Sequence, residues 1–325
     1  MSLKTLCAFR IAIDAIPSVS QINKAGREYE SRECQFRETK AWGYKAFEKN
    51  RGTDEEFVQP LHNYRWLYLQ IALWKRILPS AVVKQEANRK IRALEKERGE
   101  PLSKKEKREY QQEVHDQLLQ KAFQKETVYQ VIFDQETGQV WMDAPSESLQ
   151  NDIIRLLRRS LNSLPVTPVF ETGNLPSLFD AWVAGKLDLP KGISVGDKAK
   201  AIDPDDPQAT VTLSHEDLHD PDIKNVLGSR MLKLLGLESE HLGCTLTDSG
   251  TLKSIVVSVD TEDGDADPNH MLTLWCMEMT RFIEQLSAAI GHSDEQPAFT
   301  VSIPETHSHE DKGLAPETGA EPSDE

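Results

Sequence analysis

The fold is decided by residues 77–123, which read ILPSAVVKQEANRKIRALEKERGEPLSKKEKREYQQEVHDQLLQKAF. Apolar residues recur every three or four positions on both sides of Gly99-Glu100-Pro101, which is the spacing of a helix face. Ser103-Lys104-Lys105-Glu106 fits a capping box, in which a serine hydroxyl and a glutamate satisfy free backbone amides. We therefore predict an antiparallel helical hairpin over residues 77–125. Its apolar stripes are Val83, Ala87, Ile91 and Leu94, then Tyr110, Val114, Leu118 and Ala122.

The same stretch is a positively charged island in an acidic chain. Residues 75–125 hold 14 Lys and Arg against 8 Asp and Glu, whereas the whole chain has a formal net charge of −15. A charged partner feels the local potential within a Debye length of about 8 Å, not the total charge. An acidic chain of this kind therefore remains compatible with a polyanionic partner at the hairpin.

The residues around the hairpin predict an α+β unit. Tyr64–Ile77 and Thr127–Phe133 are aromatic and β-branched runs typical of strands, and Leu149–Leu161 carries the broad apolar face of a helix. With an N-terminal strand, these elements form a central domain over residues 1–76 and 126–185. The helical hairpin is predicted to project from this domain.

A second α+β unit is predicted for residues 186–291. Its boundary is a stretch rich in Gly, Pro and Asp, and its clearest elements are a strand pair around Asp248-Ser249-Gly250 and a helix over Pro268–Ile290. Beyond it, residues 292–325 are acidic and rich in Pro and Ser, which predicts a disordered tail. The expected fold class is α+β, with mixed antiparallel sheets and flanking helices.

Composition and motifs exclude several classes of protein. No apolar run approaches the ~20 residues of a membrane span, and the first residues lack a signal peptide, so we expect a cytoplasmic protein with no membrane partner. The four cysteines are far apart, which is typical of reduced thiols. Nucleotide-binding and hydrolase signatures are missing, so we predict no catalytic residues, no metal and no cofactor.

One motif points to an enzyme. His215-Glu216-Asp217-Leu218-His219 fits the H-E-x-x-H pattern, in which one helix places two imidazoles on zinc and the Glu acts as general base. Its context favours a helix-capping loop instead, because a strand-like run precedes it and Pro221 disfavours a helix at Asp220. A zinc metallohydrolase that uses His215, Glu216 and His219 is the alternative hypothesis.

The charge pattern of the hairpin has two interpretations. Arg89, Arg92 and Lys96 form one stripe on the first helix, and Lys104, Lys107 and Arg108 begin the second. Interleaved glutamates permit a solvated surface of ion pairs, whereas the surplus of six positive charges favours phosphate. A stripe of Lys and Arg without a base-reading motif implies contact with a nucleic-acid backbone. A third hypothesis is a scaffold whose basic hairpin pairs with an acidic protein.

The chain resembles the recombination-associated RdgC family of bacteria. The likeness lies in Ile77-Leu78-Pro79-Ser80-Ala81-Val82-Val83-Lys84, in Lys121-Ala122-Phe123 and in the run from Leu156 to Val166, LLRRSLNSLPV. It implies a ring-shaped homodimer that encircles double-stranded DNA without sequence preference and restrains the RecA recombinase. It also implies a nucleoid location, with the hairpin as the tip of the ring and the second unit as its base.

The resemblance also implies site residues. Phe123 matches an aromatic residue at the tip contact between subunits, although an aromatic at a helix end is more often part of a core. The basic residues expected to contact phosphates are Lys84, Arg89, Arg92, Lys104, Lys107, Arg158 and Arg159. Where the base domain of relatives can carry consecutive lysines, this chain has His215-Glu216, a departure that leaves DNA contact by that loop open.

Overall fold

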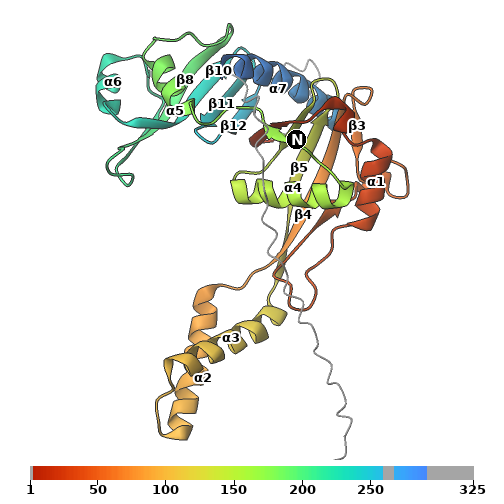
Figure 1. The fold of residues 1–325 in the computed structure, drawn as a ribbon, viewed down its shortest axis with the longest axis vertical. Coiled ribbons are helices and arrows are strands. Elements are labelled where there is room, and N and C mark those ends of the chain that lie inside the picture. Colours follow the sequence, from red (N-terminus) through yellow and green to blue (C-terminus); the bar gives the residue numbers. More distant parts are fainter. Residues whose placement is uncertain (1–2, 259–266, 291–325) are drawn as a thin grey trace, which may run out of the picture. The chain divides into compact units, whose positions relative to one another are not determined.

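The computed structural model of the protein describes residues 3–258 and 267–290. It confirms the α+β class, since these residues form seven α-helices and one 12-stranded sheet in which every strand pair is antiparallel (Figure 1). The predicted acidic tail, residues 292–325, lies outside the described residues. No helix in the described ranges has the length and apolar character needed to cross a membrane.

The first half of the chain supplies seven strands and five helices, of which α2 and α3 are the predicted hairpin. In order they are β1 (Thr5–Arg10), α1 (Val19–Glu28), β2 (Lys40–Lys45), β3 (Gln59–Leu61), β4 (Trp66–Arg76), α2 (Ser80–Arg98), α3 (Lys104–Lys121), β5 (Gln124–Asp134), β6 (Gln139–Met142), α4 (Glu147–Leu161), β7 (Thr167–Pro168) and α5 (Leu175–Val183). Short 3-10 turns lie at Ile13–Ala15 and Glu48–Asn50.

The second half adds five strands and two helices. They are β8 (Ile193–Ile202), β9 (Thr210–Ser214), α6 (Pro221–Leu227), β10 (Met231–Ser239), β11 (Leu242–Thr247), β12 (Thr251–Val257) and α7 (Pro268–Ile290). The bounds of α7 are those that the sequence predicts, because its apolar spacing is regular and a proline begins it.

The strand order is β2-β4-β5-β6-β1-β12-β11-β10-β8-β9, with β3 on β4 and β7 on β1. We expected more than one sheet. The strands form a single sheet because β1 pairs with β6 on one side and with β12 on the other. The division of the chain into central, tip and base domains stays a prediction.

Both faces of the sheet are buried at β1, and successive residues of β1 point to one face and then to the other. Leu6 and Ala8 belong to a hydrophobic cluster that includes α5 and α7, and the rings of Trp141 and Trp275 meet in it edge to face. Cys7 and Phe9 belong to a second cluster that includes α1 and α4. Because successive side chains of a strand point to opposite faces, we call these the α7 face and the α4 face.

The hairpin forms as its local sequence dictates. Ser103 accepts a hydrogen bond from Glu106 N, and the Glu106 side chain accepts one from Ser103 N, so the predicted capping box is confirmed. α2 ends at Gly99, whose φ of 76° is a left-handed conformation that glycine adopts without strain. The residues buried between the two helices are Val83, Ala87, Ile91, Val114 and Leu119.

Candidate nucleic-acid interface on the hairpin

The hairpin emerges between two paired strands. β4 and β5 pair along their whole length, from Trp66 opposite Asp134 to Arg76 opposite Gln124. Just beyond this last pair, Ile77 N donates a hydrogen bond of 2.8 Å to Phe123 O. The two ends of the hairpin are therefore held side by side at the end of a strand ladder.

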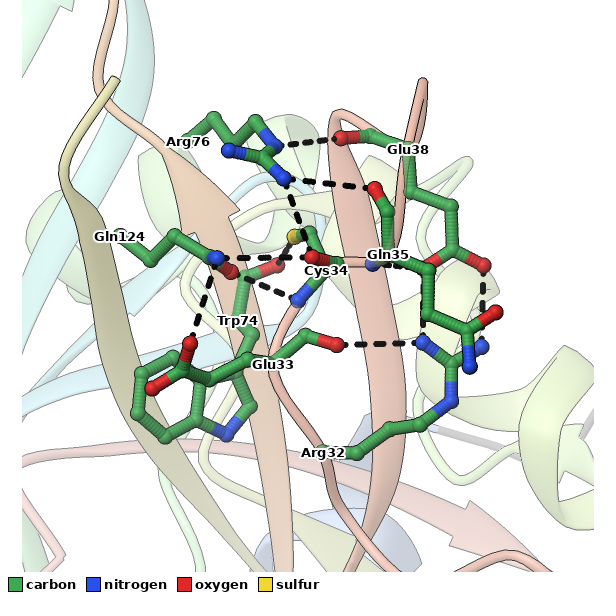
Figure 2. Close-up of polar contacts among 8 residues, drawn as sticks. All are labelled: Arg32, Glu33, Cys34, Gln35, Glu38, Trp74, Arg76 and Gln124. Carbon is green, nitrogen blue, oxygen red and sulfur yellow. Dashed lines mark hydrogen bonds and ion pairs between the residues drawn. The ribbon is translucent and has the colours of Figure 1, made fainter. Parts of the chain in front are cut away.

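Arg76 ties this base to a loop that precedes β2 (Figure 2). Its guanidinium donates to five backbone carbonyls at 3.0–3.3 Å: those of Cys34, Gln35 and Glu38 in the loop, and of Leu119 and Gln120 at the end of α3. The last carbonyls of a helix lack partners within it and carry partial negative charge, so a cation stabilises them. Arg76 thus fixes the end of α3 to residues 32–38.

The loop of residues 32–38 is itself held by charged contacts. Arg32 donates two hydrogen bonds to the Glu38 carboxylate, at 2.7 and 2.9 Å, and Gln35 N donates a third at 2.7 Å. These contacts, the Arg32 bonds first, lower the pKa of Glu38 to about 2. Cys34 N donates to the Gln124 side chain at 2.6 Å, which links the loop to β5 (Figure 2).

One side of the hairpin has a groove between α2 and α3. It consists of two hollows of about 430 and 420 Å³ that share Lys84 and Gln111. Four residues with permanent positive charge line it, and Glu95 is the one carboxylate among its lining residues. The four are Lys84, Arg92, Lys107 and Arg108, and His115 lies at one end.

Three of the four permanently charged residues that line the groove have no carboxylate partner among the described residues. Glu95 accepts hydrogen bonds from Lys107, at 2.9 Å, and from Leu102 N, and these bonds lower the pKa of Glu95, the Lys107 contact most. Within the described residues, Lys84, Arg92 and Arg108 have no carboxylate within 4.0 Å. The groove is therefore lined by three cations without a carboxylate partner.

The other side of the hairpin is neutralised by its own side chains. Arg89 pairs with Glu86 at 2.7 Å, and Lys90 donates to Gln117, which in turn donates to Glu113. The hairpin thus has partnered cations on one side and, in the groove, three cations without a carboxylate partner in the described ranges. Contact of the groove with phosphate stays a prediction.

The structure separates the residues predicted to contact phosphates. Lys84, Arg92 and Lys107 line the groove, and Lys104 is exposed one turn before Arg108. Arg89 lies outside the groove. Arg108 and His115 were missed as site residues, although Arg108 stands at i+4 from Lys104 and that spacing places both on one stripe.

Arg158 and Arg159 are not on the hairpin but at the end of α4. Arg158 Nε donates to Leu164 O at 3.0 Å, and the guanidinium of Arg159 lies 4.9 Å from the centre of the Tyr29 ring. Both side chains therefore make contacts that stabilise the fold. The prediction that they contact phosphates stays untested.

Phe123 is not part of a core. Its side chain is 87% exposed, the highest fraction among the large hydrophobic residues described, and Phe36 (67%) and Ile77 (49%) are also exposed at the hairpin base. The core interpretation of Phe123 is thus wrong, because α3 ends at Lys121 and the chain turns into β5 before the ring can reach the interior.

Comparison with known proteins identifies the family. A family model described as "Putative exonuclease, RdgC" matches residues 1–293. The chain belongs to the RdgC family. A recombination-associated protein RdgC from Pseudoalteromonas translucida is 27% identical over 307 residues, which cover 91% of this chain and 99% of that protein.

Two further RdgC relatives match over shorter stretches. The protein from Yersinia enterocolitica is 31% identical over 230 residues, 67% of this chain and 75% of the relative. That from Actinobacillus succinogenes is 31% identical over 183 residues, 56% of this chain and 60% of the relative. All three are named for recombination, whereas the description of the family model names an exonuclease.

In this RdgC family member the H-E-x-x-H motif is a loop. His215 follows β9 with a φ of 61°, and its Nδ1 lies 2.8 Å from Asp197. Asp217 accepts from His219 N, and Asp220 caps α6 by accepting from Asp222 N at 2.7 Å. The predicted helix-capping loop is confirmed, and His215 and His219 do not lie one helical turn apart. Residues 3–258 and 267–290 contain no group of three His, Cys, Asp or Glu that could hold a metal ion.

Proposed function

We propose that the protein binds double-stranded DNA without sequence preference, and that the groove between α2 and α3 contacts the sugar-phosphate backbone. The observation that carries this proposal is that Lys84, Arg92 and Arg108 line the groove without a carboxylate partner in the described structure. Each cation that neutralises a phosphate releases condensed counterions, which drives binding at low salt.

The chemistry of the groove favours backbone contact over base contact. Lys and Arg on a regular helix reach phosphates of any sequence, whereas base recognition needs bidentate donors and acceptors held inside a DNA groove. The net charge of −15 does not oppose this, because acidic residues more than about one Debye length away are screened.

The proposal includes a ring-shaped homodimer. Family membership supports it through the resemblance described above, and the 87% exposed Phe123 supplies an apolar anchor on the rigid base set by Arg76. Aromatic residues of this kind are enriched at subunit contacts. A ring around duplex DNA would limit the access of the RecA recombinase to that duplex and would place the protein in the cytoplasm on the nucleoid.

Salt titration of binding to two unrelated duplexes of equal length tests DNA binding directly. The proposal predicts equal affinities for the two duplexes and a log affinity that falls with log salt by about 0.9 per phosphate contact. An absence of binding at low salt would favour a protein-interaction scaffold. A strong preference for one duplex would contradict backbone contact.

Two companion measurements address assembly and activity. In sedimentation, the wild-type protein is expected at the mass of a dimer, and Phe123→Ala is expected to shift the equilibrium toward the monomer. The matched control is Val256→Ala, an exposed residue on β12. End-labelled duplex incubated with the protein and Mg²⁺ is expected to stay intact, and its degradation would support the exonuclease named in the family description instead.

A further inference from the structure

One hollow of the groove is lined by a histidine as well as by cations. This hollow, of about 430 Å³, is bordered by Leu78 and Ser80, which lie where α2 begins, so it is the end of the groove next to the strand ladder. His115 of α3 lines the same hollow, and 38% of its side chain is exposed. The groove therefore contains an imidazole ring that both water and a ligand can reach.

Charged groups from both helices lie around His115. Lys84 of α2 and Arg108 of α3 line this hollow, and neither has a carboxylate within 4.0 Å in the described residues. Arg108 and His115 are about two helical turns apart, which places them on one face of α3. The neighbour of opposite charge is Asp116, which contacts the ring. An anion that enters the hollow thus meets two permanent cations and one titratable group.

The contact with Asp116 decides which ring nitrogen is available to a ligand. Nδ1 of His115 lies 3.0 Å from Oδ1 of Asp116, and an ionised carboxylate can only accept, so Nδ1 carries a hydrogen. Gln112 also donates to Asp116, at 2.9 Å, which fixes the carboxylate. Nε2 of the neutral ring is then an acceptor, which repels a phosphate oxygen. Protonation makes Nε2 a donor and gives the ring a positive charge.

We propose that His115 is a proton-dependent phosphate contact, through which the groove binds the DNA backbone more tightly as the pH falls. This inference rests on the proposed function. An opposite charge within about 4–6 Å favours the charged form of a titratable group, so a phosphate held by Lys84 and Arg108 favours the imidazolium of His115. Because such coupling is reciprocal, protonation of His115 strengthens the binding of that phosphate to the same extent.

Few other kinds of group in the protein change charge in the pH range where this contact would act. Imidazole is the side chain whose charge ordinarily changes between about pH 5 and 8. Burial raises the pKa of all four cysteine thiols, so these thiols stay neutral in that range. Among the described histidines, His115 alone lines the groove. A dependence of groove binding on pH is therefore assigned to this residue.

The test compares His115→Gln with His241→Gln. His241 is a matched control, because its side chain is 39% exposed, its Nε2 lies 3.8 Å from Glu240, and it lies between β10 and β11. After circular dichroism has shown that both full-length variants fold, binding to one short fluorescent duplex is measured from about pH 5.5 to about 8 at constant salt. We expect log affinity to fall with rising pH, by up to about 1 per pH unit, in the wild type and in His241→Gln. His115→Gln should lose most of this dependence.

A variant with a permanent charge gives an independent readout. His115→Lys is expected to bind duplex with little dependence on pH. At about pH 8 its slope of log affinity against log salt should be steeper than that of the wild type by about 0.9, the contribution of one further phosphate contact. Calorimetry of the wild type in two buffers of different ionisation enthalpy should show proton uptake on binding, and His115→Gln should take up fewer protons.

The outcomes separate this inference from the proposed function. The same pH dependence in the wild type and His115→Gln, or the same proton uptake in both, would overturn the role of His115. Duplex binding by the wild type in that experiment would leave the proposed function standing. Wild-type protein that binds no duplex at any pH would overturn both.

Discussion

The helical hairpin and α7 are both long helical segments, but they use their residues differently. α7 buries ten of its 23 residues, whereas α2 buries three of 19 and α3 two of 18. α7 therefore owes its stability to packing on the sheet. The hairpin owes more to its caps, its ion pairs and its attachment at Arg76.

This difference shows where function can lie. A helix with a buried apolar face has few side chains free for a partner, and changes in it are felt by the whole core. A hairpin with a thin apolar seam exposes most of its surface, so its charges can be arranged for binding. In this protein they are arranged asymmetrically, with ion pairs around Glu86 and free cations in the groove.

The largest expected effect is the loss of packing at α7. Trp275→Ala removes a ring that is 3% exposed and meets Trp141, and it should lower the free energy of unfolding by about 3–5 kcal/mol. Met277→Ala, on the exposed side of the same helix, should change it by less than about 0.5 kcal/mol. Urea denaturation compares the two, and equal losses would contradict the role given to α7.

A smaller effect is expected at the base of the hairpin. Arg76→Met removes one donor from each of five carbonyls, and hydrogen bonds to a charged group contribute about 1.5–3 kcal/mol each when measured singly. We expect a loss of at least about 2 kcal/mol, since water replaces only part of these contacts. Hydrogen exchange should show faster opening at the end of α3. Arg37→Met, in the same loop, is the control, and comparable exchange in both variants would refute the anchor.

Within the hairpin seam the effect should be smaller again and local. Val114→Ala removes buried methyl groups and should cost about 1–2 kcal/mol, because the burial of one CH₂ contributes about 0.8 kcal/mol. Hydrogen exchange should increase in α2 and α3 and stay unchanged in β4 and β5. Gln120→Ala, which changes an exposed side chain, should leave the hairpin protected. Faster exchange throughout the sheet would show that the hairpin and the core unfold together.

The smallest expected effect is a change with pH in the stability that the Glu38 contacts contribute. The folded pKa of Glu38, about 2, lies below its ordinary value of 4.5, so its contacts stabilise the fold fully above pH 4.5. That contribution is lost as the pH falls from 4.5 through about 2. Thermal melts of the wild type and Glu38→Gln should therefore converge as the pH is lowered through this range. A difference in melting temperature that does not change with pH would contradict the assignment.

The sequence predicts those parts whose signals are local. The hairpin, its capping box and α7 are read from helical spacing and end residues, which need no knowledge of the rest of the chain. The sequence does not predict α1 and β8, because small or polar residues occupy many of their buried positions and weaken the apolar periodicity. These residues are Asn23, Ala25 and Gly26 in α1, and Ala199 and Ala201 in β8. Small and polar residues at core positions blur the alternation on which such predictions depend.

The candidate site is predicted only in part for a similar reason. A count of charges finds the hairpin, but the packing of α3 on α2 decides that Lys84 and Arg92 line a groove while Arg89 does not. The bond from Arg158 to Leu164 O and the contacts of Arg76 join residues that no pattern connects. Exposure of Phe123 likewise follows from where the chain turns, not from its neighbours in sequence.

The central claim is that DNA binds the groove side of the hairpin and not its ion-paired side. Lys84→Gln/Arg92→Gln/Arg108→Gln removes groove cations that have no carboxylate partner in the described structure. Arg89→Gln/Lys90→Gln/Lys105→Gln removes the same charge from cations of the same two helices that contact Glu86, Gln117 and Glu109. In salt titrations of duplex binding, the slope of log affinity against log salt should become shallower by about 0.9 per removed contact in the first variant. The second variant should keep the wild-type slope. Equal losses in the two variants would contradict the account, because binding would then follow total charge rather than the groove.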